Sequence, residues 1–373
     1  MLKKLSLAAL VAMGSMSVAS ATDLSEAIKG VNLKGALRIR LYNEDPDKGD
    51  SYNKWRTNAA FIFAVPVSDE LKVVDRVSTE TYVRGDDAQP ATGKAANGVN
   101  SSLADNVLFA KYSKNGLTVL AGKIPVATPI TDTDLFGPPS HGAGVLGTYK
   151  VNDKLTVAAA GIDALVATDA VTVGASNTYA AAAIYKSNVA DVQAWFFKVK
   201  DMIDSDIVLS ADVKALKDAG VKIHVDYAQA ELDDSISDDT QTYFNINASF
   251  KKDALSAKLG YAVTGEDGGI VVLDGDSKLA SVAATEQADS IANTKDNNMV
   301  YAKLGYDVDE KTNVYAAYTT IDNDSVDEIQ VGGSYKYTKK FKLSAYYSML
   351  SADKTYSTGG DNNEARVEAI YKF

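Results

Sequence analysis

The chain has 373 residues, a formal net charge of −11, no cysteine, 46% hydrophobic residues and 20 tyrosines. The lack of cysteine excludes disulfides, thiolate metal sites and a cysteine nucleophile, and the negative charge argues against nucleic acid as a partner. Beyond the N-terminus, no apolar run reaches the roughly 18 residues of a membrane-spanning helix. An apolar chain of this kind can still cross a bilayer as a closed β-barrel.

The first 21 residues have the parts of a secretory signal. Lys3 and Lys4 precede an apolar stretch that begins at Leu5, and Ala19-Ser20-Ala21 is a small-x-small cleavage site. The alternative, a membrane anchor, is disfavoured because the apolar run is short and interrupted. We therefore predict a signal peptide over residues 1–21 and one mature domain over 22–373. Cleavage would remove two lysines and no acids, leaving 352 residues and a charge of −13.

Alternating hydrophobicity begins early in the mature chain. In residues 31–41, one face carries Val31, Leu33, Leu37, Ile39 and Leu41, and the other carries mainly polar side chains. A period of two predicts a strand with one apolar side. The pattern recurs at 55–67, 243–250, 255–264, 328–337 and 341–349. The register is ambiguous at 106–112, 155–163 and 191–199, the last because Trp195 and Phe197 occupy the face that is polar elsewhere.

The connections between strands are asymmetric. Short polar turns at 68–70, 114–116, 152–153, 251–253 and 338–340 alternate with long segments at 44–54, 85–104, 126–142, 165–177, 231–240, 265–297 and 353–363. A soluble sandwich also alternates, but its connections are usually short at both ends. The pattern predicts an all-β, transmembrane antiparallel barrel of about 18 strands, with short periplasmic turns and long extracellular loops. The final strand, with Tyr371 and the terminal Phe373, resembles the assembly signal of bacterial outer-membrane proteins.

The third long connection, after the strand predicted at 117–125, is unusually stiff and apolar. Prolines stand at 125, 129, 138 and 139, beside Ile130, Leu135 and Phe136. We expect this loop to fold into the pore, where Asp132 and Asp134 would line the constriction. An ordinary ordered surface loop is the alternative.

The chain contains only six arginines, all on the polar register of their strands: Arg38, Arg40, Arg56, Arg76, Arg84 and Arg366. They fall on strands one, two, three and the last, which closure of a barrel makes neighbours. The sequence thus predicts a basic wall in one sector of the lumen, facing the acidic third loop. Permanently charged guanidinium groups suit a transverse field. The alternative is that each charge is simply solvated.

Two of the predicted outer loops are acidic. Residues 231–240 and 265–297 carry many aspartates and glutamates against only Lys278 and Lys295. Such a mouth should enrich cations. Solubility, or divalent-ion bridging to anionic lipid and lipopolysaccharide head groups, explains the same charges.

Several stretches resemble one family, the Campylobacter-type major outer membrane proteins of ε-proteobacteria. The resemblance lies in residues 21–45 (ATDLSEAIKGVNLKGALRIRLYNED), 117–134 (LTVLAGKIPVATPITDTD), 155–165 (LTVAAAGIDAL) and the terminal Tyr-x-Phe. It implies an 18-stranded, trimeric, cation-preferring general porin of the outer membrane. It also implies that Ca²⁺ can bind near the constriction, with Asp132, Asp134 and Asp163 as the matching carboxylates. The third loop differs from the family's, notably in its four prolines.

The sequence therefore predicts a general diffusion porin for small hydrophilic solutes and cations, which is not an enzyme and requires no cofactor. A hydrolase would need a base, and neither His141 nor His224 has a serine or acid partner at motif spacing. A surface adhesin or structural protein would also use long acidic loops. A solute-specific channel would show an aromatic track in the lumen, which Trp195 and Phe197 alone do not make.

Overall fold

A computed structural model describes residues 30–84, 99–132, 134–136, 139–167, 176–269, 271–322, 325–353 and 360–373, without the side chains of 84, 99–103, 105 and 217. The predicted signal peptide lies outside these residues. The described chain contains no helix long and apolar enough to span a membrane. Its one short helix is a 3-10 turn, η2, at Lys217–Ala219.

The described residues form 18 strands, each 9–16 residues long. Their bounds are β1 Asn32–Pro46, β2 Tyr52–Pro66, β3 Leu71–Arg84, β4 Val99–Lys114, β5 Leu117–Pro125, β6 His141–Lys150, β7 Leu155–Val166, β8 Thr178–Lys186, β9 Ala190–Val199, β10 Ile203–Val213, β11 Val221–Leu232, β12 Thr240–Lys252, β13 Leu255–Thr264, β14 Asn298–Asp307, β15 Thr312–Ile321, β16 Val326–Lys336, β17 Phe341–Ala352 and β18 Asn362–Lys372.

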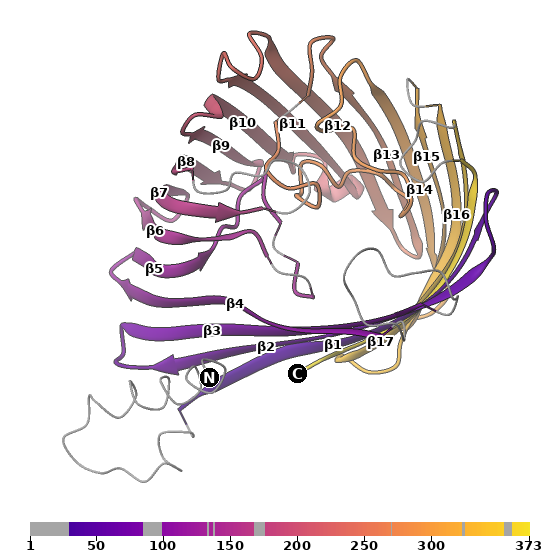
Figure 1. The fold of residues 1–373 in the computed structure, drawn as a ribbon, viewed down its shortest axis with the longest axis horizontal. Helices are drawn as coiled ribbons and strands as arrows, with labels where there is room; N and C mark the ends of the chain where they lie inside the picture. The colour runs from indigo at the N-terminus through magenta and orange to yellow at the C-terminus, as the bar shows by residue number, and fades with distance from the viewer. Residues whose placement is uncertain are drawn as a thin grey trace.

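Every strand pairs antiparallel with its neighbours in sequence, and the sheet closes where β1 meets β18. Leu37 on β1 lies opposite Tyr371 on β18 and Ala59 on β2. Figure 1 shows the strands following one another around a ring, with the C-terminus returning beside β1. Closure satisfies the backbone groups that an open sheet would leave at its edges. The predicted all-β barrel is confirmed, with the 18 strands expected.

The outer face of the barrel is apolar, as the alternation predicts. Leu259 on β13 and Leu304 on β14 are 60% and 61% exposed, and Ile329 on β16 is also exposed. These side chains point away from the ring, where a bilayer provides an apolar environment. The neighbours that alternate with them face the lumen, so the sequence periodicity sorts residues between lipid and pore.

The short turns fall where the sequence places them. The predicted turns at 68–70, 114–116, 152–153, 251–253 and 338–340 each join two consecutive strands. A further short turn, which was not predicted, precedes β15, and in it the Asp309 carboxylate accepts the backbone N–H groups of Lys311 and Thr312, both at 2.7 Å. These hydrogen bonds favour the ionised form and hold the pKa of Asp309 below its ordinary value. They also cap the turn, because they satisfy donors that the strand ladder leaves free.

The hydrophobic core lies inside the ring rather than between layers. Apolar residues of the connections after β5 and β13 pack against inward-facing residues of β9 to β13: Val126, Ile130, Val271, Val272, Leu273, Leu279, Trp195, Phe197, Val208, Ala228 and Ala262. Both connections run inside the ring of strands in Figure 1. The prediction that the third long loop folds inward is confirmed. The segment 265–297, interpreted as an acidic outer loop, is inserted as well: its apolar residues are buried in the ring, whereas Glu266, Asp267 and Asp276 stay exposed.

Candidate pore constriction

The connection after β5 is closed at its base by its own hydrogen bonds. The N–H of Val126 donates to the carbonyl of Ser140 at 2.8 Å, and the N–H of Ser140 donates to the carbonyl of Asp132 at 3.0 Å. The hydroxyl of Thr131 donates to the carbonyl of Val126 at 2.6 Å. We call residues 126–140 the constriction loop. The hydrogen bonds at its base and the buried Ile130 hold the described part of the loop against the wall.

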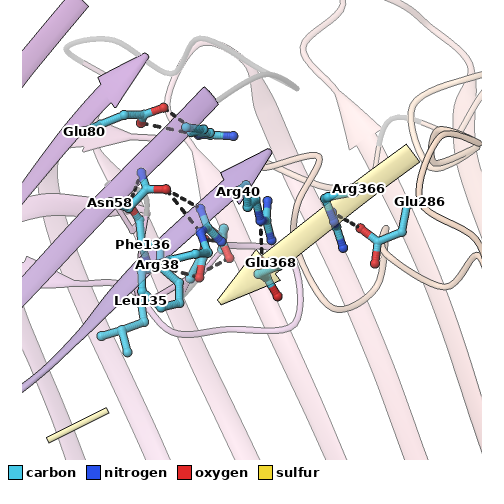
Figure 2. Close-up of polar contacts among 12 residues, drawn as sticks. Arg38, Arg40, Asn58, Glu80, Leu135, Phe136, Glu286, Arg366 and Glu368 are labelled. Atoms are coloured by element: carbon cyan, nitrogen blue, oxygen red, sulfur yellow. Dashed lines mark hydrogen bonds and ion pairs between the residues drawn. The ribbon is translucent and has the colours of Figure 1, made fainter. Parts of the chain in front are cut away.

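The tip of the constriction loop reaches the wall formed by β1, β2 and β3. The guanidinium of Arg76 donates to the carbonyls of Asp134 and Leu135 at 2.6 and 2.7 Å. The guanidinium of Arg38 lies 4.3 Å from the ring centroid of Phe136 and 3.8 Å from a carboxylate oxygen of Asp134. Figure 2 shows Arg38 beside Leu135 and Phe136 of the loop. The loop thus spans from β5 to the arginine-bearing strands.

Three of the arginines predicted to form a basic wall are in ion pairs. Arg40 pairs with Glu368, Arg56 with Glu80 at 2.5 Å, and Arg366 with Glu286 at 2.8 Å (Figure 2). Arg38 also donates to the amide oxygen of Asn58 at 3.0 Å. The arginines do lie on adjacent strands, as expected, but each of these guanidinium groups has an acidic neighbour. The side chain of Arg84 lies outside the described part of the chain.

The connection after β13 crosses the inner wall as a strap, residues 282–288. Glu328 on β16 holds it, because its carboxylate accepts the backbone N–H groups of Glu286, Gln287 and Ala288 at 3.3, 3.0 and 2.6 Å. Carboxylates that accept several N–H groups make strong, charge-assisted bonds.

Hydroxyl and amide groups of other strands extend this attachment. Thr319 on β15 accepts the N–H of Ala284 at 3.1 Å. The side chain of Gln287 bonds to Ser348 on β17 at 3.0 Å and to Asn362 on β18 at 2.7 Å. The strap is therefore attached to β15, β16, β17 and β18.

The two inserted connections touch each other. The N–H of Leu273 donates to the carbonyl of Ile130 at 3.0 Å, and the N–H of Leu279 donates to the carbonyl of Pro129 at 3.1 Å. The Ser140 hydroxyl donates to the carboxylate of Asp274 at 2.7 Å, and Asp274 is fully buried. Both segments therefore narrow the lumen as one packed unit.

The predicted calcium ligands lie on two elements, the constriction loop and β7. Asp132 and Asp134 are close, since the N–H of Asp134 donates to the Asp132 carboxylate at 2.8 Å. Asp163, however, is an exposed residue on β7 at an irregularity in its pairing with β6. Within the described residues, no group of three carboxylates or histidines is placed to hold a metal ion. Calcium binding by Asp132 or Asp134 together with Asp163 therefore stays a prediction.

The histidines do not form a nucleophilic triad. His224 lies between Asp212 and Asp226, with 2.8 Å from each ring nitrogen to a carboxylate oxygen. Ser210 donates to Asp226 rather than to the imidazole, so the ring cannot take the serine proton. His141, at the start of β6, has Nδ1 2.6 Å from the carbonyl of Pro139. His224 therefore belongs to a polar network of the lumen wall.

Sequence reasoning missed the strap and its partner Glu328. The signal was present: Val271, Val272 and Leu273 make this long connection as apolar as the constriction loop. The many acids of the segment pointed instead to solvent. Glu286 and Asp274 are two of those acids, and they serve as partners of Arg366 and Ser140.

A closed 18-stranded barrel with a lumen narrowed by inserted connections defines the class of outer-membrane porins. The family model described as Campylobacter major outer membrane protein matches residues 1–373, so the chain belongs to that family. Its location is accordingly the outer membrane. The fold and the family point to a channel rather than to an enzyme.

Solved structures share the fold at low sequence identity. OccK9 (OpdG) of Pseudomonas aeruginosa matches with a TM-score of 0.73 and 13% identity over 93% of this chain and 99% of that one. OccAB3 of Acinetobacter baumannii matches with a TM-score of 0.72 and 13% identity over 92% and 99%. OpdQ of P. aeruginosa matches with a TM-score of 0.69 and 14% identity over 92% and 99%. No curated protein matches the chain significantly.

Proposed function

We propose that this porin is a general diffusion channel for small hydrophilic solutes and ions, with a preference for cations. The observation that carries the proposal is the constriction loop, whose tip brings the Asp134 carboxylate to the charged wall of β1 to β3. The arginines there are largely neutralised by acids. The mature chain is strongly acidic overall, so the net field favours cations.

Planar bilayer recording tests the channel and its selectivity separately. Purified protein should give large stepwise conductance. Under a KCl gradient, the reversal potential should have the sign of the K⁺ equilibrium potential, which indicates cation selectivity. The double variant Asp132→Asn, Asp134→Asn should shift that potential towards zero. The matched control, Asp69→Asn with Asp153→Asn, removes the same charge from two short turns. A folded barrel that does not conduct would overturn the proposal, and the adhesin alternative would then come forward.

A homotrimer and bound Ca²⁺ remain predictions of the family resemblance. Chemical cross-linking of native membranes would reveal a trimer as a ladder ending at three subunits. Addition of Ca²⁺ or a chelator during the bilayer recording would test the ion. A calcium effect that is equal in the Asp132→Asn, Asp134→Asn variant would exclude these two carboxylates as ligands.

A further inference from the structure

Two lysines face each other on the inner wall. Lys258 on β13 and Lys303 on β14 lie directly opposite in the register of their strands. Each precedes an outward-facing leucine, Leu259 or Leu304, so both lysines face the lumen. Directly opposed side chains have Cβ atoms about 4.5–5.5 Å apart, and like charges in such positions destabilise a sheet. The pair is therefore an unfavourable arrangement for the fold alone.

Tyrosine rings, rather than carboxylates, lie beside the ammonium groups. The Nζ atom of Lys258 is 4.8 Å from the ring centroid of Tyr301, and that of Lys303 is 3.9 Å from the ring centroid of Tyr315. Tyr301 crosses the wall above Gly260, where a Cβ atom would come within 2.1 Å of the ring. A ring face attracts a cation without neutralising its charge, so both positive charges are retained.

The acids whose charge acts on these lysines, Asp226 and Glu286, have other partners. Asp226, whose charge reaches Lys258, accepts hydrogen bonds from Asn245 at 2.9 Å and from His224 at 2.8 Å. Glu286, whose charge reaches Lys303, is paired with Arg366 at 2.8 Å. Among the described residues, no carboxylate forms an ion pair with either lysine. The arginines of β18 and β1 to β3 differ from these lysines, because several of them form ion pairs with acids.

Both lysines are placed to meet solutes. They are half-buried rather than enclosed. Lys258 comes three residues after Leu255, where β13 begins, and Lys303 four residues before Asp307, where β14 ends. At about 3.4 Å per residue, the pair lies roughly 10–14 Å along the strands from their periplasmic ends. The Nζ of Lys258 also reaches the carbonyl of Val282 at 3.4 Å, so the pair adjoins the strap.

We propose that Lys258 and Lys303 form a binding subsite for compact multivalent anions in the periplasmic half of the channel. The ammonium group is a point charge on a flexible stem, so the subsite would select for charge rather than for shape. An anion that bridges the two groups would relieve their mutual repulsion. The proposal rests on the channel function, and it adds an inner anion site to a channel whose overall field favours cations.

Citrate is a suitable probe because it is compact and multivalent. Citrate added to the side of the short turns should cause brief current blockades in a planar bilayer. Calorimetric titration of the detergent-solubilised barrel should show citrate binding without any need for conductance. The variant Lys258→Gln, Lys303→Gln should lose the blockades and bind citrate at least about tenfold more weakly. After screening by salt, each lysine charge should account for a loss of affinity of about fivefold or less.

The matched control is Lys339→Gln, Lys340→Gln, which removes the same charge from an exposed turn between β16 and β17. This control should show the same citrate blockades and the same citrate affinity as the unmodified protein. If the double variant fails to give a heat-modifiable barrel, the single variant Lys303→Gln takes its place. Normal conductance with no citrate binding, or equal binding by the double variant and its control, would overturn the anion site and leave the channel standing. Absence of conductance with retained citrate binding would overturn the channel function and leave the anion site standing.

Discussion

The inner wall has two unlike sectors. Between β9 and β13 it carries the apolar residues that pack against the inserted connections, among polar side chains such as Asp226: Trp195 is 7% exposed and Phe197 2% exposed beneath these connections. From β18 through β1 to β3 it carries the arginines and their acidic partners. Apolar residues on the wall allow a connection to bury its own apolar residues inside the barrel. Charged residues on the wall keep water and ions beside them. Apolar packing thus holds the inserted connections in the first sector, whereas hydrogen bonds hold the tip of the constriction loop and the strap in the second.

Removal of the connection after β13 should have the largest effect on this division. The N–H of Asp296 donates to the carbonyl of Gly265 at 2.8 Å, so the two ends of the segment already meet. A few glycines in place of residues 266–295 should close the hairpin and uncover the apolar sector. Single-channel conductance should rise by at least about twofold, because lumen width sets the current. The comparison deletion is 234–238, in a connection with exposed residues, which should leave conductance unchanged.

The next prediction compares the loss of stability from substitutions on the two faces of β9. Phe197 faces inward and stacks on Trp195 with ring centroids 5.6 Å apart, whereas Phe196 is 42% exposed on the outer face. Phe197→Ala should lower the free energy of unfolding by about 3–5 kcal/mol, as expected for a buried phenylalanine. Phe196→Ala should cost much less. Urea unfolding in lipid vesicles, followed by circular dichroism, measures both. Equal losses would contradict a packed lumen sector.

The apolar sector also explains where sequence reasoning stopped. Alternation placed β1, β12, β13, β16 and β17 without ambiguity, because each has one apolar and one polar face. It was ambiguous near 191–199 because both faces of β9 are apolar: Phe196 meets lipid and Phe197 meets an inserted connection. It was also ambiguous near 106–112 and 155–163, where the β3–β4 and β6–β7 pairings shift register. Periodicity reports the burial of a face but not the partner that buries it.

The candidate site was predictable only in part. The arginines could be placed on adjacent strands because closure of a barrel is a topological consequence of its class. Their partners could not, since Glu286 lies 80 residues from Arg366 in sequence and reaches it only because the strap is inserted. The acids of 265–297 looked solvated by composition. Whether such an acid is solvated or paired depends on contacts between segments that are distant in sequence. These contacts leave no local pattern in the chain.

The smallest expected effect tests the charged sector at its contact with the constriction loop. Arg38 touches Asn58, Phe136 and Asp134. Arg38→Gln removes the positive charge next to the Asp134 carboxylate, so the constriction should become more attractive to cations. The cation-to-anion permeability ratio, taken from the reversal potential, should rise by about twofold. Lys34→Gln on the same strand removes an equal charge at the exposed start of β1. If the two variants shift the ratio equally, the arginines act only through net charge, and the pairing at the loop has no special part in selectivity.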